Sequence, residues 1–96
     1  MHPDRLTDIP IQRALGQLPG WSRKGDALVK SYPFPTFSAG IGFVNRVARV
    51  AEAAGHHPDL DVRVNKVVCH LSTHSAGGIT QKDLDLAGAI ERVAAG

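Results

Sequence analysis

The chain has 96 residues, of which 43% are hydrophobic and 21% are charged, and its formal net charge is +2. A chain of this length supports a single core, so we expect residues 1–96 to form one domain. Its 11 basic residues are scattered rather than gathered into a stripe, which argues against a nucleic-acid-binding protein.

Neither a targeting segment nor a disulfide is expected. No apolar stretch approaches the roughly 18 residues of a transmembrane helix. The opening residues, MHPDRLTDIP, lack the basic and apolar regions of a secretion signal. The single cysteine, Cys69, lies in an apolar run and cannot form an internal disulfide, which favours a reducing compartment. The sequence therefore predicts a cytoplasmic protein with no membrane contact.

The first third of the chain predicts a helix and then a hairpin. The helix is expected to open near Thr7 or Asp8 and to stop at Pro19-Gly20. Its apolar residues follow the spacing of one buried face: Ile11, Ala14, Leu15 and Leu18. Gly25-Asp26 is a turn signal between two short runs, and Pro33 indicates a strand end or an edge.

Residues 37–54 form the longest periodic segment and predict a helix. Thr36 is suited to its N-cap, Gly55 to the position after its end, and Pro58 prevents continuation. The apolar residues form two adjacent stripes: Phe37, Ile41, Val44, Ala48 and Ala51, then Phe43, Val47, Val50 and Ala54. This face is wider than one sheet contact demands, so we expect a second packing partner, such as another subunit.

The segment DVRVNKVVCHLSTH predicts a second hairpin. With a turn at Asn65-Lys66, three facing pairs share the core side of the sheet: Val64 with Val67, Val62 with Cys69, and Leu60 with Leu71. The opposite side then holds the polar set: Asp61, Arg63, Val68, His70, Ser72 and His74. A slightly longer loop is the alternative, because lysine is not ideal in a tight primed turn.

The last helix has a clear start. Thr80 with Asp83 three residues later is typical of a capping box, and Ile79 with Leu84 fits the accompanying hydrophobic staple. Its buried stripe is Leu86, Ala87, Ile90, Val93 and Ala94. The element order α-β-β-α-β-β-α predicts an α+β two-layer sandwich, in which a four-stranded antiparallel sheet carries three helices on one face.

Four of the five histidines lie within the 21 residues from Ala54 to His74. His56 and His57 follow the end of the long helix, and His74 follows a strand, so the three imidazoles are expected to converge on one cleft. Imidazole titrates near neutral pH, with an unperturbed pKa of about 6.5. Two histidines in opposite protonation states can therefore supply both an acid and a base to one small molecule.

Three other interpretations of these residues remain open. Each histidine taken alone is an ordinary loop or strand-end residue, and His70 is interpreted as a surface residue. A zinc site is disfavoured, because adjacent histidines point apart and no HExxH or CxxC motif accompanies them. A nucleophilic cysteine is disfavoured as well, because Cys69 shares the spacing of core residues.

The order Glu52, His56-His57-Pro58, His74, Asp83 resembles the spacing of the pterin-4a-carbinolamine dehydratases, whose animal members are also known as a dimerisation cofactor. The phrases HHPD, VNKV, LSTH, GGIT and KDLDLA are similar to that family, as is FxxxIxFxxRVAxxAE in the central helix. The resemblance covers the chain from Trp21 to the C-terminus.

This resemblance implies dehydration of 4a-hydroxytetrahydropterin to quinonoid dihydropterin, which recycles the pterin used by aromatic amino acid hydroxylases. Pterin is the substrate, and no cofactor or metal is implied. The implied catalytic residues are His56 and His74 as the acid/base pair, with His57 orienting the pterin. The implied substrate-binding residues are these three histidines together with Gly55, Ser72, Thr73 and Ser75.

The resemblance also implies supporting residues. Glu52 either orients an imidazole or is a surface carboxylate, Pro58 shapes the chain reversal, and Asp83 is favoured as a capping residue. Two positions depart from the family pattern, because Val64 stands where an aromatic residue is expected and Leu60 where tryptophan is frequent. Both fall on the predicted core side, so repacking is the milder interpretation.

The family resemblance finally implies a homodimer or homotetramer, formed through the 37–54 helix and a sheet edge. The alternative function is a non-catalytic pterin-binding or dimerisation/coactivator protein that uses the same apolar helix face. Retention of all three histidines favours the enzyme, because a scaffold has no physical need for them.

Overall fold

The computed structural model describes residues 4–95. Its elements follow the predicted order: α1 (Asp8–Leu15), β1 (Ser22–Lys24), β2 (Ala27–Pro33), α2 (Phe37–Ala54), β3 (Asp59–Val62), β4 (Lys66–Leu71), the 3-10 turn η1 (His74–Ala76) and α3 (Gln81–Ala95). None of the helices described is long and apolar enough to cross a membrane.

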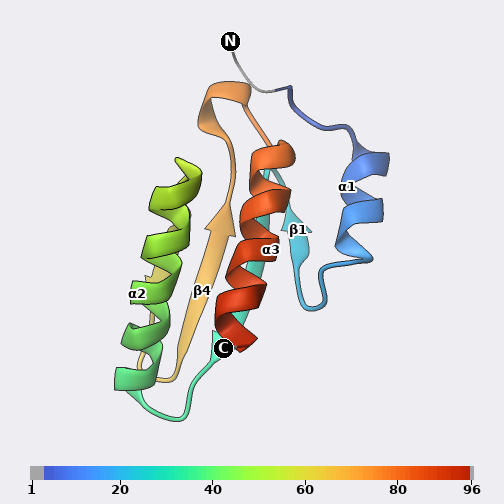
Figure 1. Ribbon diagram of the computed structural model, residues 1–96. Coiled ribbons are helices and arrows are strands. Elements are labelled where there is room, and N and C mark those ends of the chain that lie inside the picture. The colour runs from blue at the N-terminus through green and yellow to red at the C-terminus, as the bar shows by residue number, and fades with distance from the viewer. Residues whose placement is uncertain (1–3, 96) are drawn as a thin grey trace.

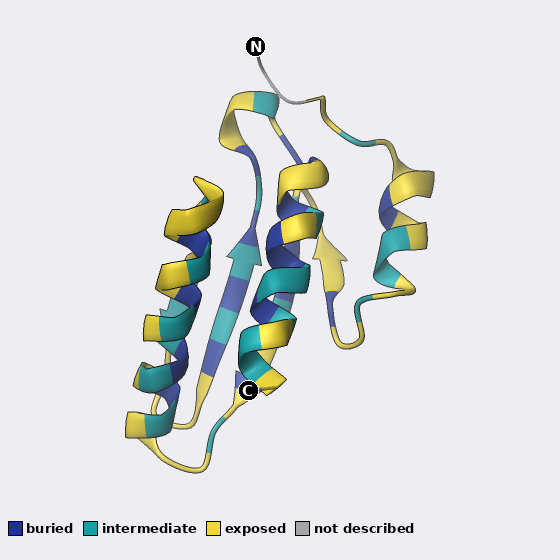
Figure 2. Cartoon of the chain, viewed as in Figure 1, coloured by how far each residue is buried: buried dark blue, intermediate teal, exposed yellow. Residues whose placement is uncertain are grey.

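The strands form one antiparallel sheet in the order β1-β2-β4-β3. The helices lie on one side of it, with α2 and α3 next to each other across the sheet and α1 beside its β1 end (Figure 1). Buried residues concentrate where helices and strands face each other (Figure 2). The predicted α+β two-layer sandwich is confirmed.

The first helix is shorter than predicted. It ends at Leu15 with Gly16 as its C-cap, rather than at Pro19-Gly20. Glycine has a low helix propensity, and the following residues continue through tighter turns, in which Leu18 N–H donates to the Leu15 carbonyl at 3.2 Å.

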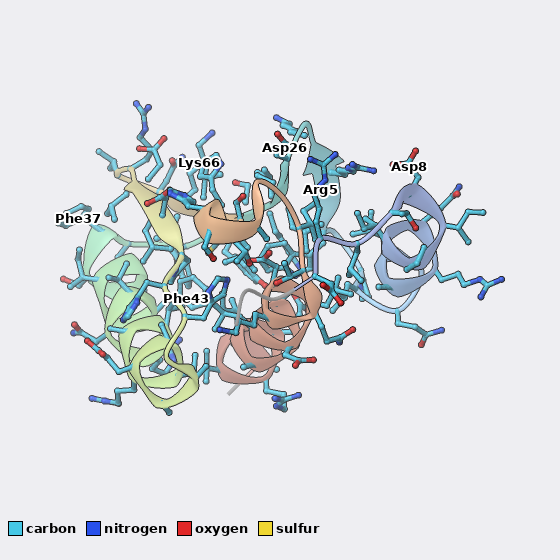
Figure 3. All side chains as sticks on the ribbon, turned by 90° about the horizontal axis from the view of Figure 1, so that it is seen from above. Arg5, Asp8, Asp26, Phe37, Phe43 and Lys66 are labelled. Carbon is cyan, nitrogen blue, oxygen red and sulfur yellow. The ribbon has the colours of Figure 1, made fainter. Side chains whose placement is uncertain are left out.

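The caps of α2 are those predicted. The Thr36 hydroxyl accepts a hydrogen bond from Ala39 N–H at 3.1 Å, and Gly55 adopts the left-handed conformation with φ of 64°. Phe43 lies inside the molecule, whereas Phe37 lies at its outer edge (Figure 3). Phe37 and Ile41 are 52% and 36% exposed. The sheet thus leaves part of the apolar helix face uncovered.

The predicted register of the second hairpin is wrong by two residues. Leu60 pairs with Cys69 and Val62 with Val67. A two-residue turn at Asn65-Lys66 needs a positive φ at both positions, and no non-glycine residue in the described chain has one. A longer loop forms instead, closed by Arg63 N–H donating to the Lys66 carbonyl at 2.9 Å.

The longer loop changes which side chains are buried. Both Val62 and Val64 were predicted to lie on the core side, but Val64 is 78% exposed in the loop and Val62 is 38% exposed. Neither belongs to the core. The alternation along β4 is confirmed, because Val67, Cys69 and Leu71 are fully buried. Burial raises the pKa of the Cys69 thiol to about 12, although the nearby Lys30 charge acts to lower it.

The Glu91 carboxylate on α3 holds this helix to the sheet. It accepts hydrogen bonds from Trp21 Nε1–H at 3.1 Å, from Lys30 Nζ at 2.5 Å and from the Tyr32 hydroxyl. Burial acts to raise the pKa of Glu91, but these hydrogen bonds and the Lys30 charge outweigh it and lower that pKa below its ordinary value. Two donors on β2 and one just before β1 therefore depend on one acceptor.

We expect Glu91→Gln to lower the free energy of unfolding by about 1–3 kcal/mol at pH 7, because partly buried donors lose a charged acceptor. Because the pKa of Glu91 is lower in the folded state, its charge stabilises the fold at pH values above the unfolded-state pKa, near 4.5. That contribution disappears as pH falls through the folded-state pKa. Urea unfolding between pH 7 and pH 3 should show the two proteins converging in acid. A difference in unfolding free energy between the two proteins that stays constant from pH 7 to pH 3 would contradict this role for the carboxylate.

Candidate functional site

A cleft of about 450 Å³ opens where the end of α2, the end of β4 and the start of α3 meet. Eight of the residues predicted for the site line it: Gly55, His56, His57, Pro58, Ser72, Thr73, His74 and Ser75. Three further lining residues were not predicted: Asp59, His70 and Lys82. The predicted supporting residues Glu52 and Asp83 do not line the cleft, but each contacts one of its histidines.

The end of α2 sets the position of His56. Gly55 takes the left-handed conformation, and His56 N–H then donates to the Ala51 carbonyl at 3.2 Å. Such a cap satisfies the last helical carbonyls and turns the chain sharply. The His56 side chain, only 12% exposed, is thereby directed from the helix end toward α3.

His56 and Asp83 form the closest polar contact of the cleft. His56 Nε2 lies 2.5 Å from Asp83 Oδ1, and the Asp83 side chain is fully buried. A carboxylate accepts hydrogen bonds, so Nε2 carries the proton and the ring is held in one tautomer. Nδ1 is then the ring atom that can exchange a proton with a bound molecule.

The other Asp83 oxygen is occupied by two more donors. Oδ2 accepts hydrogen bonds from the Thr73 hydroxyl and from Thr80 N–H, each at 2.9 Å. The second of these is the predicted capping-box contact at the start of α3. The capping role was expected, but no local pattern indicated that the same carboxylate also holds His56.

His57 lies in a more open position. Its Nε2 is 3.3 Å from Glu52 Oε2, and these side chains are 63% and 77% exposed. Glu52 therefore contacts His57 rather than His56. An exposed pair at this distance is weak, so solvent leaves the His57 ring free to turn toward a bound molecule.

His74 reaches the cleft from the opposite side. It begins η1 and is exposed, and the turn ends at Gly77, which has φ of 71°. His56 and His74 thus lie on segments that follow a helix and a strand, as the sequence predicts. Within residues 4–95, no three or more His, Cys, Asp or Glu side chains are grouped closely enough to hold a metal ion.

The unpredicted lining residues follow from the sheet. His70 lies on the sheet side opposite the core and is half-buried, and it pairs with Asp59 across β3 and β4. The alternation along β4 placed His70 with Ser72, which gave a signal for its position. Lys82 lies in the first turn of α3 beside Asp83, and only the completed fold brings it to the cleft.

Comparison with known proteins decides the family. The sequence model of the family described as Pterin 4 alpha carbinolamine dehydratase matches residues 4–93. The chain belongs to this family. Val64, where the family pattern expects an aromatic residue, is a loop residue here and does not line the cleft.

Several relatives match almost end to end. A Roseiflexus sp. (strain RS-1) protein assigned as a pterin-4-alpha-carbinolamine dehydratase is 52% identical over 89 residues, which is 93% of this chain and 96% of that one. A Thermomicrobium roseum protein with the same assignment is 53% identical over 83 residues, or 86% of this chain and 89% of that one.

Solved structures share the fold. A Brucella melitensis protein described as a transcriptional coactivator/pterin dehydratase has a TM-score of 0.90 and 34% identity, covering 95% of this chain and 99% of that one. A pterin dehydratase-like protein, described as a RuBisCO assembly factor in the alpha-carboxysome, has a TM-score of 0.62 and 20% identity. At that identity the likeness concerns the fold alone.

We expect Asp83→Asn to lower stability by about 1–3 kcal/mol and to release the His56 tautomer, because the carboxylate accepts all three contacts. Urea unfolding measures the first effect, and ¹⁵N spectra of the His56 ring nitrogens measure the second. Asp85→Asn is the matched control, since Asp85 is exposed and bonds only to Gln81. If the His56 ring keeps its proton on Nε2 in Asp83→Asn, then the Asp83 carboxylate does not fix the tautomer, contrary to our expectation.

Proposed function

We propose that the chain dehydrates 4a-hydroxytetrahydropterin to quinonoid dihydropterin, using His56 and His74 as base and acid. The observation that carries this proposal is the tautomer-fixing contact of His56 with Asp83, in the same cleft as His74. Membership of the dehydratase family supports the reaction class, that of a hydro-lyase.

The reaction needs one proton added and one removed. The C4a–O bond breaks as the hydroxyl oxygen is protonated, and water leaves. The ring nitrogen N5 loses its proton, and the electron pair of the N5–H bond forms the N5=C4a double bond. Atoms and charge balance with one acid and one base, because the ring nitrogen supplies the electrons.

His56 is suited to be the base. With Nε2–H bound to Asp83, the neutral ring presents the lone pair of Nδ1, which can accept the N5 proton. The imidazolium formed in this step stays beside a buried carboxylate, which stabilises the positive charge. Asp83 thus holds the ring before the transfer and stabilises it afterwards.

His74 is suited to be the acid. It stands on the other wall of the cleft and is exposed, so it can take up a proton from solvent between turnovers. His57, also exposed, orients the pterin, together with groups of Gly55, Ser72, Thr73 and Ser75 along the lining. Glu52 and Pro58 support the His57 side of the cleft.

This activity places the protein in tetrahydropterin recycling. We propose a functional link to an aromatic amino acid hydroxylase that supplies the carbinolamine and to a reductase that consumes the quinonoid dihydropterin. We propose that residues 1–96 act as one domain and that the enzyme works in the cytoplasm. The buried free thiol of Cys69 suits a reducing compartment.

We expect wild type to accelerate dehydration of 4a-hydroxytetrahydropterin generated in situ, followed by absorbance of the quinonoid product. General acid/base groups are each worth about 100- to 10,000-fold, and spontaneous dehydration compresses the measurable range. His56→Ala and His74→Ala should each lose most of the acceleration, and the double variant should approach the background rate.

Arg13→Ala, on the exposed side of α1, is the control variant for this assay. It should match wild type. A folded wild-type protein that binds pterin but gives no acceleration would contradict the dehydratase proposal, and the coactivator-like role would then become the leading one.

We propose further that the chain self-associates into a homodimer or homotetramer through α2 and a sheet edge. The uncovered apolar strip of α2, which includes Phe37 and Ile41, supports this proposal. Large exposed apolar patches mark interaction sites. β3 is an edge strand, with one side of its backbone free to pair.

We expect Ile41→Glu to shift the protein to a smaller species in sedimentation velocity, because a carboxylate cannot be buried in an apolar interface without a partner. Ile9→Glu is the matched control, since Ile9 is 62% exposed on α1. An unchanged sedimentation coefficient in Ile41→Glu would contradict the assignment of this face.

A further inference from the structure

The segment Asp4–Leu6, which we call the N-terminal strap, runs beside the loop that joins β4 to α3. Leu6 N–H donates to the Ile79 carbonyl at 2.8 Å, and Arg5 Nη1 donates to the Gly77 carbonyl at 3.4 Å. In the view from above, Arg5 lies against this loop (Figure 3). Residues more than 70 positions apart in sequence are thereby joined.

Gly78 allows the close approach of Arg5. A Cβ atom at Gly78 would lie 2.9 Å from Arg5 Cδ and 3.2 Å from Cγ, so the Arg5 side chain would have to shift to make room for it. Gly78 does not have a positive φ, so its backbone conformation alone does not require glycine. The crowding comes from the Arg5 side chain alone, whose aliphatic part packs directly on the Gly78 backbone.

The strapped loop is the one that carries His74. Thr73 N–H donates to the Gly78 carbonyl at 2.9 Å and Gly78 N–H to the Thr73 carbonyl at 3.3 Å, so these residues close a loop around η1. Inside the loop, two backbone hydrogen bonds join residues three positions apart. Ala76 N–H donates to the Thr73 carbonyl and Gly77 N–H to the His74 carbonyl, both at 3.1 Å. Local bonds of this kind leave a loop free to move as a unit.

We propose that Arg5 is a positioning residue, which holds the loop at residues 73–78 so that the His74 imidazole stays in the cleft. Leu6 packs against the core cluster and anchors the strap. The exposed Arg5 then packs its side chain on Gly78, which is bridged to Thr73, and donates to the neighbouring Gly77 carbonyl. The kinetic consequence rests on the proposed dehydratase function, whereas the effect on His74 does not.

The strap also touches the other half of the site. The Ile79 carbonyl accepts the hydrogen bond from Leu6, and the next residue, Thr80, donates its N–H to Asp83. The Thr73 hydroxyl donates to the same carboxylate. Asp83 in turn holds His56. Because Asp83 is fully buried and has three donors, we expect His56 to change much less than His74 when Arg5 is removed.

The test compares wild type, Arg5→Ala, Arg5→Lys and the matched control Arg13→Ala, whose side chain is exposed in the last turn of α1. Arg5→Ala should keep the wild-type melting temperature, because Arg5 is exposed and lies outside the core cluster. We expect kcat to fall on the order of 10-fold, since a 1 Å misplacement costs about 100-fold. Arg5→Lys keeps the aliphatic contact and one donor, so it should restore most of the rate.

A readout independent of activity follows the loop itself. In Arg5→Ala, we expect changed chemical shifts for the His74 ring and faster amide exchange at residues 74–78, with His56 ring signals close to wild type. Gly78→Ala should disturb the same signals, and adding Arg5→Ala should relieve that disturbance, because the clash requires both side chains. Non-additivity of this kind marks direct contact.

The proposal is overturned if Arg5→Ala leaves the His74 signals and kcat at wild-type values, or if Arg13→Ala loses as much rate as Arg5→Ala. It is also overturned if the effects of Gly78→Ala and Arg5→Ala simply add. A wild-type protein without dehydratase activity would refute the proposed function alone, because the His74 signals would still report whether the strap holds the loop.

Discussion

One buried carboxylate holds the cleft together. Asp83 accepts the Thr80 N–H that starts α3, the Thr73 hydroxyl that follows β4, and the His56 ring that follows α2. Burying a charge is costly unless donors compensate it, and here three donors from three segments do so. Stability and site geometry therefore depend on the same contact, and His56 takes its orientation only when all three segments are in place.

The two catalytic candidates are held by different means. His56 is largely enclosed and bonded to Asp83, so its ring has a defined tautomer, whereas His74 is exposed on a short loop. This difference suits a base that must keep one lone pair available and an acid that must exchange protons with solvent. The Glu91 network lies away from the cleft and fixes α3 to the sheet, so it supports the site without contacting it.

The sequence predicted the element order, the local caps and the shared cleft of the histidines, but it missed particular long-range contacts. The caps at Thr36 and Gly55 depend on neighbouring residues, and they were found from sequence. The predicted β3–β4 register was wrong because the tight turn at Asn65-Lys66 does not form, and the longer loop there also makes a tertiary contact, with Phe34 N–H donating to the Asn65 carbonyl at 2.8 Å. The Asp83 contact with His56 had no local signal, since a capping box already explains an aspartate at that position. Family resemblance marked the residue, and the fold explains its second contact.

The most direct test of this account is a crystal structure with an unreactive dihydropterin bound. We predict that the ring lies in the 450 Å³ cleft, with N5 facing His56 Nδ1, C4a on the His74 side, and the contact between His56 Nε2 and Asp83 intact. A pterin bound elsewhere on the protein, or one bound here with N5 and C4a turned away from both histidines, would contradict the assignment of His56 and His74 as its base and acid.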